Sequence, residues 1–315
     1  YMILSVSRRT DIPNYYSEWF FNRIKEGYLY VRNPMNAHQI SKIHISPEVV
    51  DCIVFWTKNP ENMMGNLDIL KDYYYCFQFT LTGYGKDIEP GLPEKPNHLI
   101  STFQTLSSKI GAEKMIWRYD PILLNPKYTA EYHIKAFEDI AGQLRGYTNK
   151  VVISFVDIYT KIRQQVNTLQ MKPITDADMI KISKAMAEIA VSNDMIIETC
   201  AEHIDLTSVG VAHGSCINKT FIENIIGSKL QGSKDKNQRP ECGCFESVEV
   251  GTYNTCKNGC KYCYANFSPQ QVKNLTALYD PNSPLLCGTV GYEDKITERK
   301  VKSLRVEQLS FLDQL

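Results

Sequence analysis

Six short apolar runs alternate with amphipathic segments over the first 200 residues of this 315-residue chain. Each run has the length and composition of a buried strand, and the segments between them repeat apolar residues at helical spacing. Strand–helix units in succession form a parallel sheet, and six of them suit a partial barrel. The predicted fold class is therefore α/β, a partial (β/α)6 TIM-like barrel over residues 1–200. Its strands are expected near residues 2–7, 51–56, 75–81, 114–117, 151–156 and 195–198.

Three of the ten cysteines, Cys256, Cys260 and Cys263, form the motif CKNGCKYC. Asn258 and Gly259 let the chain curl between the first two thiolates, so the three sulfurs can converge on one face of an iron–sulfur cube. A [4Fe–4S] cluster normally takes four cysteines, so a set of three leaves one iron open to a non-protein ligand. The spacing differs from the common zinc patterns, which pair two similar C-x2-4-C halves.

A second set of four cysteines consists of Cys200, Cys216, Cys242 and Cys244. The glycine inside the Cys-Gly-Cys pair permits both sulfurs to turn the same way. We expect these four thiolates to hold an auxiliary [4Fe–4S] cluster. Two alternatives stay open, a structural zinc site with four thiolates and a set of cysteines that bind no metal. In a further alternative, the Cys-Gly-Cys pair donates the fourth ligand of the first cluster, which would leave no open iron.

Ionisable residues gather where the predicted strands end. Burying charges at the mouth of a barrel costs desolvation, so contacts with a ligand explain them as a group better than folding does. For any single residue, an internal network of ion pairs is an equally good explanation. The residues expected to be catalytic are Arg8, Asp11, Lys58, Arg118 and Asp120.

Four further residues are expected to bind a cofactor. Arg9 follows the first strand and suits a carboxylate or phosphate, because a guanidinium donates two parallel hydrogen bonds. Glu198 ends the sixth strand. Tyr262 and Tyr264 flank the third cysteine of the motif, where an aromatic ring can stack on a base.

Composition limits the classes of function. Lys plus Arg and Asp plus Glu both number 35, so the formal charge of zero gives no overall attraction to nucleic acid or anionic membranes. We expect no membrane span, because no apolar run reaches 18 residues, and no signal peptide, because the apolar start is too short. Cysteines in a chain of this kind are reduced thiols or metal ligands, which predicts a cytoplasmic location.

The CxxxCxxC motif resembles the signature of the radical SAM superfamily, and CKNGCKYCYA resembles its spore-photoproduct-lyase-like branch. This resemblance implies that the open iron binds the amino and carboxylate groups of S-adenosylmethionine (SAM). The reduced cluster would then cleave SAM to a 5′-deoxyadenosyl radical, with electrons from a donor such as flavodoxin or ferredoxin. The opening SRRTDIP, the segment FWTKNP and the late cysteine motif together resemble an uncharacterised bacterial family, known only as a domain of unknown function.

The order of the elements is unusual for that superfamily, whose barrels usually carry the motif just after their first strand. Here the motif follows all six predicted strands. Either the barrel is circularly permuted and residues 247–253 supply the strand before the cluster loop, or a tail folds over the mouth of a complete barrel. Residues 201–315 are accordingly expected to form a cysteine-rich iron–sulfur segment and a C-terminal tail packed on the barrel.

The function expected from these observations is that of a radical SAM-type enzyme. Its substrate would be a nucleic-acid lesion, a nucleotide-derived compound or another small molecule. One alternative is a redox-sensing or electron-transfer iron–sulfur protein without SAM chemistry. The other is a nucleic-acid-binding module stabilised by zinc.

Overall fold

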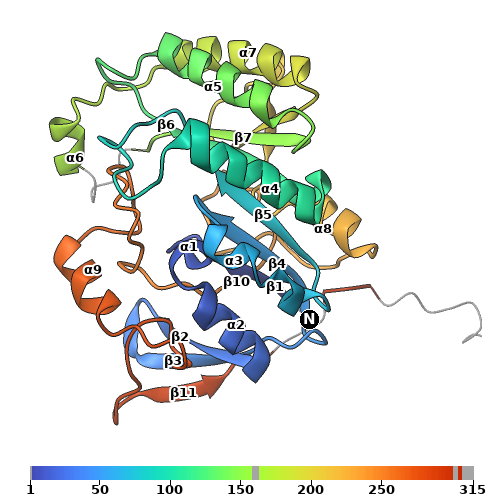
Figure 1. The fold of residues 1–315 in the computed structure, drawn as a ribbon, viewed down its shortest axis with the longest axis vertical. Helices are drawn as coiled ribbons and strands as arrows, with labels where there is room; N and C mark the ends of the chain where they lie inside the picture. The colour runs from blue at the N-terminus through green and yellow to red at the C-terminus, as the bar shows by residue number, and fades with distance from the viewer. Residues whose placement is uncertain (1, 158–162, 301–303, 307–315) are drawn as a thin grey trace, which may run out of the picture.

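The computed structural model of the chain describes residues 2–157, 163–300 and 304–306. Its main element is a sheet of eight parallel strands (Figure 1), which confirms the predicted α/β class. In sheet order the strands are β10 (Val248–Glu249), β1 (Met2–Val6), β4 (Val50–Thr57), β5 (Tyr75–Thr80), β6 (Met115–Ile122), β7 (Lys150–Phe155), β8 (Ile196–Cys200) and β9 (Ala212–Gly214). Among the described residues, β10 and β9 are the two ends of this order, so these strands form an open sheet.

The six predicted strands are β1, β4, β5, β6, β7 and β8, and they are consecutive neighbours in the sheet. Two short strands were not among the six. Both β9 and β10 come from the chain after residue 200, and β10 lies inside the 247–253 stretch. It pairs in parallel with β1, through Leu4 and Val248. The cysteine motif therefore follows a strand that sits beside the first strand of the chain.

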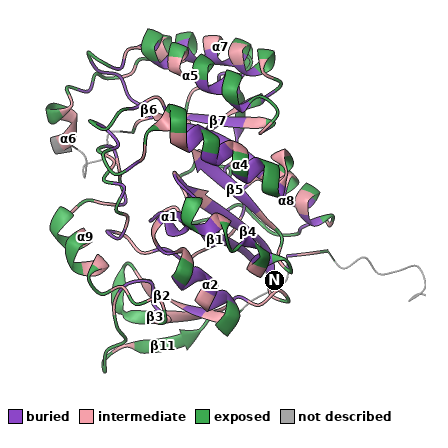
Figure 2. Cartoon of the chain, viewed as in Figure 1, coloured by how far each residue is buried: buried purple, intermediate pink, exposed green. Residues whose placement is uncertain are grey.

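Three long helices lie side by side over one face of the sheet (Figure 1). They are α4 (Ile100–Ile110), α5 (Ala130–Leu144) and α7 (Asp176–Ser192). The last two begin at threonine caps, where the side chain accepts a hydrogen bond from a backbone N–H of the first turn. Figure 2 shows that the strands beneath these helices are buried and that the outer surfaces of the helices are exposed, as expected of amphipathic helices.

The remaining helices are short. They are α1 (Ile12–Tyr15), α2 (Ser17–Glu26), α3 (Glu61–Met64), α6 (Arg163–Thr168), α8 (Lys219–Ile226) and α9 (Pro269–Thr276), with single turns η1 (Leu67–Leu70), η2 (Lys95–Leu99), η3 (Ala112–Lys114) and η5 (Thr207–Val209). The sequence after β4 predicts a single helix over residues 61–73, and this prediction is wrong. The segment breaks into α3 and η1 at Gly65 and Asn66, two residues of low helix propensity.

A second, three-stranded sheet was not predicted. It comprises β2 (Tyr28–Asn33), β3 (Asn36–His44) and β11 (Lys295–Glu298) in the order β11–β3–β2. Many of its residues are exposed or only partly buried, so it lacks the apolar runs that identify the strands of the main sheet. Arg32 binds Asp294 at 2.6 Å and ties the β2–β3 hairpin to the segment before β11.

The two faces of the main sheet are covered by different material, because side chains alternate along a strand. In β1, Leu4 and Val6 face the core shared with the long helices, whereas Ile3 belongs to a second apolar cluster. That second cluster also contains Cys52 and Cys76, with residues of α8 and of the chain between Cys216 and Phe245. These elements cover the amino-terminal half of the second face. Cys52, Cys76 and Cys287 are buried, as expected of small apolar residues.

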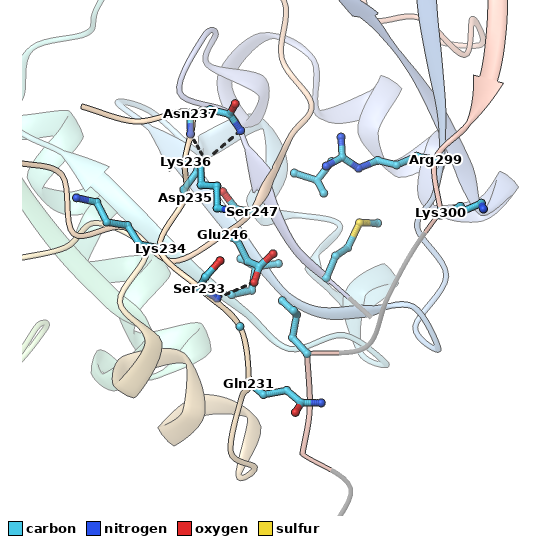
Figure 3. Close-up of a pocket in the computed structure, with 15 residues that line it drawn as sticks. Gln231, Ser233, Lys234, Asp235, Lys236, Asn237, Glu246, Ser247, Arg299 and Lys300 are labelled. Atoms are coloured by element: carbon cyan, nitrogen blue, oxygen red, sulfur yellow. Dashed lines mark hydrogen bonds between the residues drawn. The ribbon is translucent and has the colours of Figure 1, made fainter. Parts of the chain in front are cut away.

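Two cavities lie near this second face. The smaller, about 460 Å³, opens at the carboxyl ends of the parallel strands and is called the site cavity below. The larger, about 570 Å³, lies beside the start of β1 (Figure 3), where Arg299 and Lys300 enter from one side and Lys236 from the other. None of the residues expected to be catalytic, to bind a cofactor or to hold a metal lines it. None of the helices in the described ranges is long and apolar enough to cross a bilayer.

Phe137→Ala should lower the free energy of unfolding by about 3–5 kcal/mol, because it opens a cavity between α5 and β6. The Phe137 ring is fully buried and stacks on Trp117, with 4.7 Å between ring centroids. Val191→Ala, on the exposed surface of α7, is the matched control and should change stability by no more than about 0.5 kcal/mol. Chemical denaturation measures both, and equal midpoints for the two variants would contradict this packing.

Candidate functional site

The site cavity collects residues that lie far apart in the sequence. Its walls come from the carboxyl ends of β1, β4, β5, β6, β7 and β8, and from the cysteine-rich segment that follows them. It includes every residue expected at the site except Glu198, namely Arg8, Arg9, Asp11, Lys58, Arg118, Asp120, Cys200, Cys216, Cys242, Cys244, Cys256, Cys260, Tyr262, Cys263 and Tyr264. Glu198 does not line the cavity, and it forms an ion pair of 2.6 Å with Lys150.

Cys256, Cys260 and Cys263 lie on one loop after β10, and each is partly exposed. Gly259 adopts a left-handed conformation with φ of 67°, which reverses the chain between the first two cysteines. The N–H of Cys263 donates to the carbonyl of Cys260 at 3.1 Å and closes the second turn. All three cysteines line the site cavity. Burial, followed by the charges of Asp11 and of the other two cysteines, raises the pKa of Cys256.

Asn258, between the first two cysteines, anchors this loop to the start of the chain. Its side-chain oxygen accepts hydrogen bonds from the amide of Asn14 at 3.2 Å and from the hydroxyl of Tyr15 at 2.9 Å. Its amide donates to the carboxylate of Asp11 at 3.0 Å. Asn258 is almost fully buried, so the loop is fixed from within.

Asp11 joins three segments through one buried carboxylate. Besides Asn258, it accepts hydrogen bonds from the hydroxyl of Thr57 at 2.7 Å, the N–H of Lys58 at 2.8 Å and the N–H of Asn14 at 3.2 Å. Burial raises the pKa of Asp11 despite these donors. The SRRTDIP and FWTKNP segments are therefore the supports of the cysteine loop. Asp11 is expected to be catalytic, but in the structure its carboxylate supports the cysteine loop through Asn258.

The Gly- and Pro-rich loop at residues 83–96 holds the same cysteine loop from the other side. The N–H of Gly91 donates to the carbonyl of Asn258 at 3.0 Å, and the N–H of Lys261 donates to the carbonyl of Ile88 at 2.9 Å. A Cβ on Gly91 would lie 2.6 Å from the carbonyl oxygen of Asn258, so only glycine allows this approach.

Glu89, on this loop, binds two lysines and a tyrosine in the interior. Its carboxylate lies 2.8 Å from Nζ of Lys58, and it also contacts Lys95 and the hydroxyl of Tyr262. Burial would raise the pKa of Glu89, but the charges of Lys58 and Lys95 outweigh it and lower the pKa to about 2. Burial would lower the pKa of Lys58, but Glu89 and then the thiol of Cys260 raise it.

Trp56 lies between two arginines of the cavity wall. The guanidinium carbons of Arg8 and Arg118 lie 5.4 Å and 5.2 Å from its ring centroid, within the range of cation–π attraction. Arg118 also binds Asp120 at 2.5 Å and donates to the sulfur of Cys216 at 3.0 Å. The charge of Arg118 is thus shared between a carboxylate and a cysteine.

Arg8 and Arg9 donate to neutral oxygens. Arg8 donates from Nη2 to the hydroxyl of Ser247 at 3.1 Å, and its Nε is buried without a hydrogen-bond partner. Arg9 donates to the carbonyl of Gly251 at 3.3 Å, and its guanidinium lies over the ring of Tyr253. Burial would lower the pKa of Arg8, but the nearby charge of Glu249 raises it, so Arg8 already has an anionic neighbour.

The second set of cysteines also converges. Cys216, Cys242 and Cys244 belong to one buried cluster of side chains, and Cys200 packs against it. Among the residues that the structure describes, no three His, Cys, Asp or Glu side chains are arranged to hold a single metal ion. The ligands of a cluster bind separate irons, so a cluster and a single ion require different arrangements of sulfurs.

The two tyrosines of the motif have different environments. Tyr262 is buried, its ring lies 5.7 Å from that of Tyr84, and burial raises its pKa. Tyr264 is 44% exposed and donates to the carbonyl of Arg8 at 3.2 Å. Tyr264 is therefore the better placed of the two to meet a ligand.

Sequence reasoning missed two polar residues of this site. Glu89 stands in a loop whose glycines and prolines were recognised, but nothing in the sequence indicates that the loop folds onto the cysteine motif. Asn258 was noted only for chain flexibility, although its amide is the main anchor of the loop. Trp56 was considered a core residue, yet it lines the cavity.

Comparison with family models gives one match, to a family described as Domain of unknown function (DUF1848), over residues 3–265. This confirms the expected membership of an uncharacterised family. The match includes both cysteine sets and every charged residue of the cavity named above. No protein of the curated collection matches the chain.

Asn258→Ala should lower the free energy of unfolding of the metal-free protein by about 1–3 kcal/mol, because it leaves the buried Asp11 carboxylate short of a donor. Amide exchange should quicken at residues 256–263. Asn274→Ala, on the exposed surface of α9, is the control and should change stability by less than about 0.5 kcal/mol. Unchanged exchange in the motif loop would show that Asn258 does not anchor it.

Glu89 should make stability depend on pH below about 4.5. Its pKa is about 4.5 when unfolded and about 2 when folded, so its contribution is present above pH 4.5 and is lost as the pH falls toward 2. The difference in unfolding free energy between the wild type and Glu89→Gln should shrink over that window by up to roughly 3 kcal/mol. A difference that stays constant from pH 5 to pH 2 would contradict the lowered pKa.

Proposed function

The chain belongs to the DUF1848 family, whose description states no activity, and we propose that it is a radical SAM-type enzyme. The observation that carries this proposal is the position of Cys256, Cys260 and Cys263, which line a cavity at the carboxyl ends of parallel strands. Binding and catalytic residues of parallel-stranded folds collect at this edge. The proposed ligand set is thus next to a space for the cofactor and substrate.

The residues of the loop fit a cluster with one open iron. Three thiols on one fixed loop are the right donors, because cluster irons take thiolate ligands. Asn258 and Gly91 fix the loop before any metal binds, so little ordering is needed on binding. Lys58 supplies a positive charge near Cys260, which offsets the negative charge of the thiolates.

When bound, the reduced cluster would supply the electron that cleaves SAM to methionine and a 5′-deoxyadenosyl radical. The chain's own residues bind, orient and shield. Arg8 and Arg9 offer guanidiniums to a carboxylate, of SAM or of the substrate, and the unpartnered Nε of Arg8 is a donor without an acceptor. Tyr264 and Trp56 offer ring faces to an adenosyl group or a substrate.

The network of Glu89, Lys58 and Tyr262 has a supporting role in this proposal. It holds the Tyr262 hydroxyl and therefore the backbone between Cys260 and Cys263. Glu89 binds both Lys58 and Lys95, so its carboxylate offsets only part of their positive charge. The proposed electron donor is a small low-potential protein such as flavodoxin or ferredoxin, and the proposed substrate is a small molecule or nucleotide-derived compound.

We further propose that the fold is a circularly permuted partial barrel. The strand before the cluster loop would be β10, at the edge of the sheet next to β1. The parallel pairing of Leu4 with Val248 supports this, because it gives the late strand the direction of the others. In this arrangement the chain starts at the second strand of the barrel.

The test is anaerobic production and reduction of the full chain, followed by addition of SAM. We expect 5′-deoxyadenosine by mass spectrometry and a change in the electron paramagnetic resonance of the reduced cluster when SAM binds. Single Cys→Ala changes at Cys256, Cys260 or Cys263 should remove the nucleoside and about four irons per chain. Cys52→Ala, a buried cysteine outside the cavity, should change neither.

Two results would contradict the proposed function. One is wild-type protein that holds iron and sulfide but neither responds to SAM nor forms the nucleoside, which would favour an electron-transfer or sensing protein. The other is wild-type protein that holds zinc in place of iron.

A further inference from the structure

The four cysteines outside the motif come together from three separate parts of the chain. Cys200 ends β8, Cys216 follows β9, and Cys242 and Cys244 belong to the segment between α8 and β10. Cys216, Cys242 and Cys244 pack in one buried cluster, with Cys200 against it. All four line the site cavity.

The groups around these thiols suit negatively charged sulfurs. The N–H of Ile217 donates to the sulfur of Cys244 at 3.4 Å, and Nη1 of Arg118 donates to that of Cys216 at 3.0 Å. Arg118 is buried, and a buried cation requires an anionic partner. Asp120 meets one side of the guanidinium, and Cys216 meets the other.

The segment that carries the Cys-Gly-Cys pair has little structure of its own. Residues 227–247 form no helix and no strand, only isolated bridges such as Lys234 to Phe245. Long segments of this kind in a compact domain are usually functional. A bound group that cross-links Cys242 and Cys244 to Cys200 and Cys216 would fasten the segment to the sheet, because the free energy of metal binding stabilises the folded state.

We propose that Cys200, Cys216, Cys242 and Cys244 hold a second [4Fe–4S] cluster on the wall of the cavity that the motif cysteines line. This set would use all four thiolates and have no open iron, so its role differs from that of Cys256, Cys260 and Cys263. The proposal does not rest on SAM chemistry, because it concerns only what the four thiols bind.

Two features favour a cluster over a zinc ion. The ligands are two single cysteines and a Cys-x-Cys pair, which differs from the C-x2-4-C halves of structural zinc sites. The four sulfurs also border an open cavity of about 460 Å³, whereas a structural zinc ion is enclosed by its ligands. A cluster is larger than an ion and needs such space beside its ligands.

The experiment measures iron, acid-labile sulfide and zinc in the anaerobically purified full chain. We expect about eight irons and eight sulfides per chain, with little zinc. The triple variant Cys256→Ala/Cys260→Ala/Cys263→Ala should keep about four of each, whatever its behaviour toward SAM. In Cys216→Ala and Cys242→Ala, the motif cluster should remain and the total should fall to about four. The control Cys52→Ala/Cys76→Ala changes a buried pair outside the cavity and should lose none.

A triple variant that is folded by circular dichroism and holds no iron would overturn the proposal. If that variant does not fold, the wild-type content decides, and about four irons per chain would reject a second cluster. One zinc per chain that is lost in Cys216→Ala would assign the four thiols to a zinc ion. Disulfides among these cysteines, found by mass spectrometry of the anaerobic protein, would also exclude the cluster. Loss of nucleoside formation with eight irons retained would reject only the proposed SAM chemistry.

Discussion

One buried carboxylate holds the site together. The Asp11 carboxylate accepts hydrogen bonds from α1, from the end of β4 and from the cysteine loop, and it is buried. Burying a carboxylate without hydrogen-bond donors costs free energy. The donors around Asp11 are therefore held in place by the need to bond this carboxylate. The position of Asn258, and with it the motif loop, follows from this constraint.

The alternation of side chains along the strands explains why the same sheet serves as both core and site. In β6, Trp117 and Tyr119 pack under the long helices, whereas Arg118 and Asp120 face the cavity. The second face is apolar at its amino-terminal half, where Ile3 meets the segment around Phe245. The charged residues of the cavity lie toward the carboxyl ends, where the cysteine loops arrive. The ion pair of Lys150 with Glu198 lies outside the cavity.

The sequence predicts the main sheet well, because its strands are apolar runs that nothing except burial explains. It predicts the polar, half-exposed β2, β3 and β11 poorly, since their pattern is that of a surface segment. The charged residues at the strand ends were recognised from the same logic, and the structure brings them to one cavity. Their individual roles were beyond the sequence. Whether Asp11 contacts a ligand or a neighbouring amide depends on the position of Asn258. Only the tertiary structure determines that position.

The cationic side chains of the cavity suit the nearby cysteine sulfurs as well as they would suit a substrate. Each cysteine set has a buried cation beside it, since Lys58 lies near Cys260 and Arg118 touches Cys216. Thiolates that bind a cluster carry negative charge into a partly buried space, and nearby cations reduce the cost. Carboxylates already balance part of this charge, through Glu89 and Asp120. A cation that has both a carboxylate and a thiolate as neighbours is only partly available to each of them. Arg9 differs from these cations, because it contacts the carbonyl of Gly251 and the ring of Tyr253, whereas Arg8 also has the charge of Glu249 nearby.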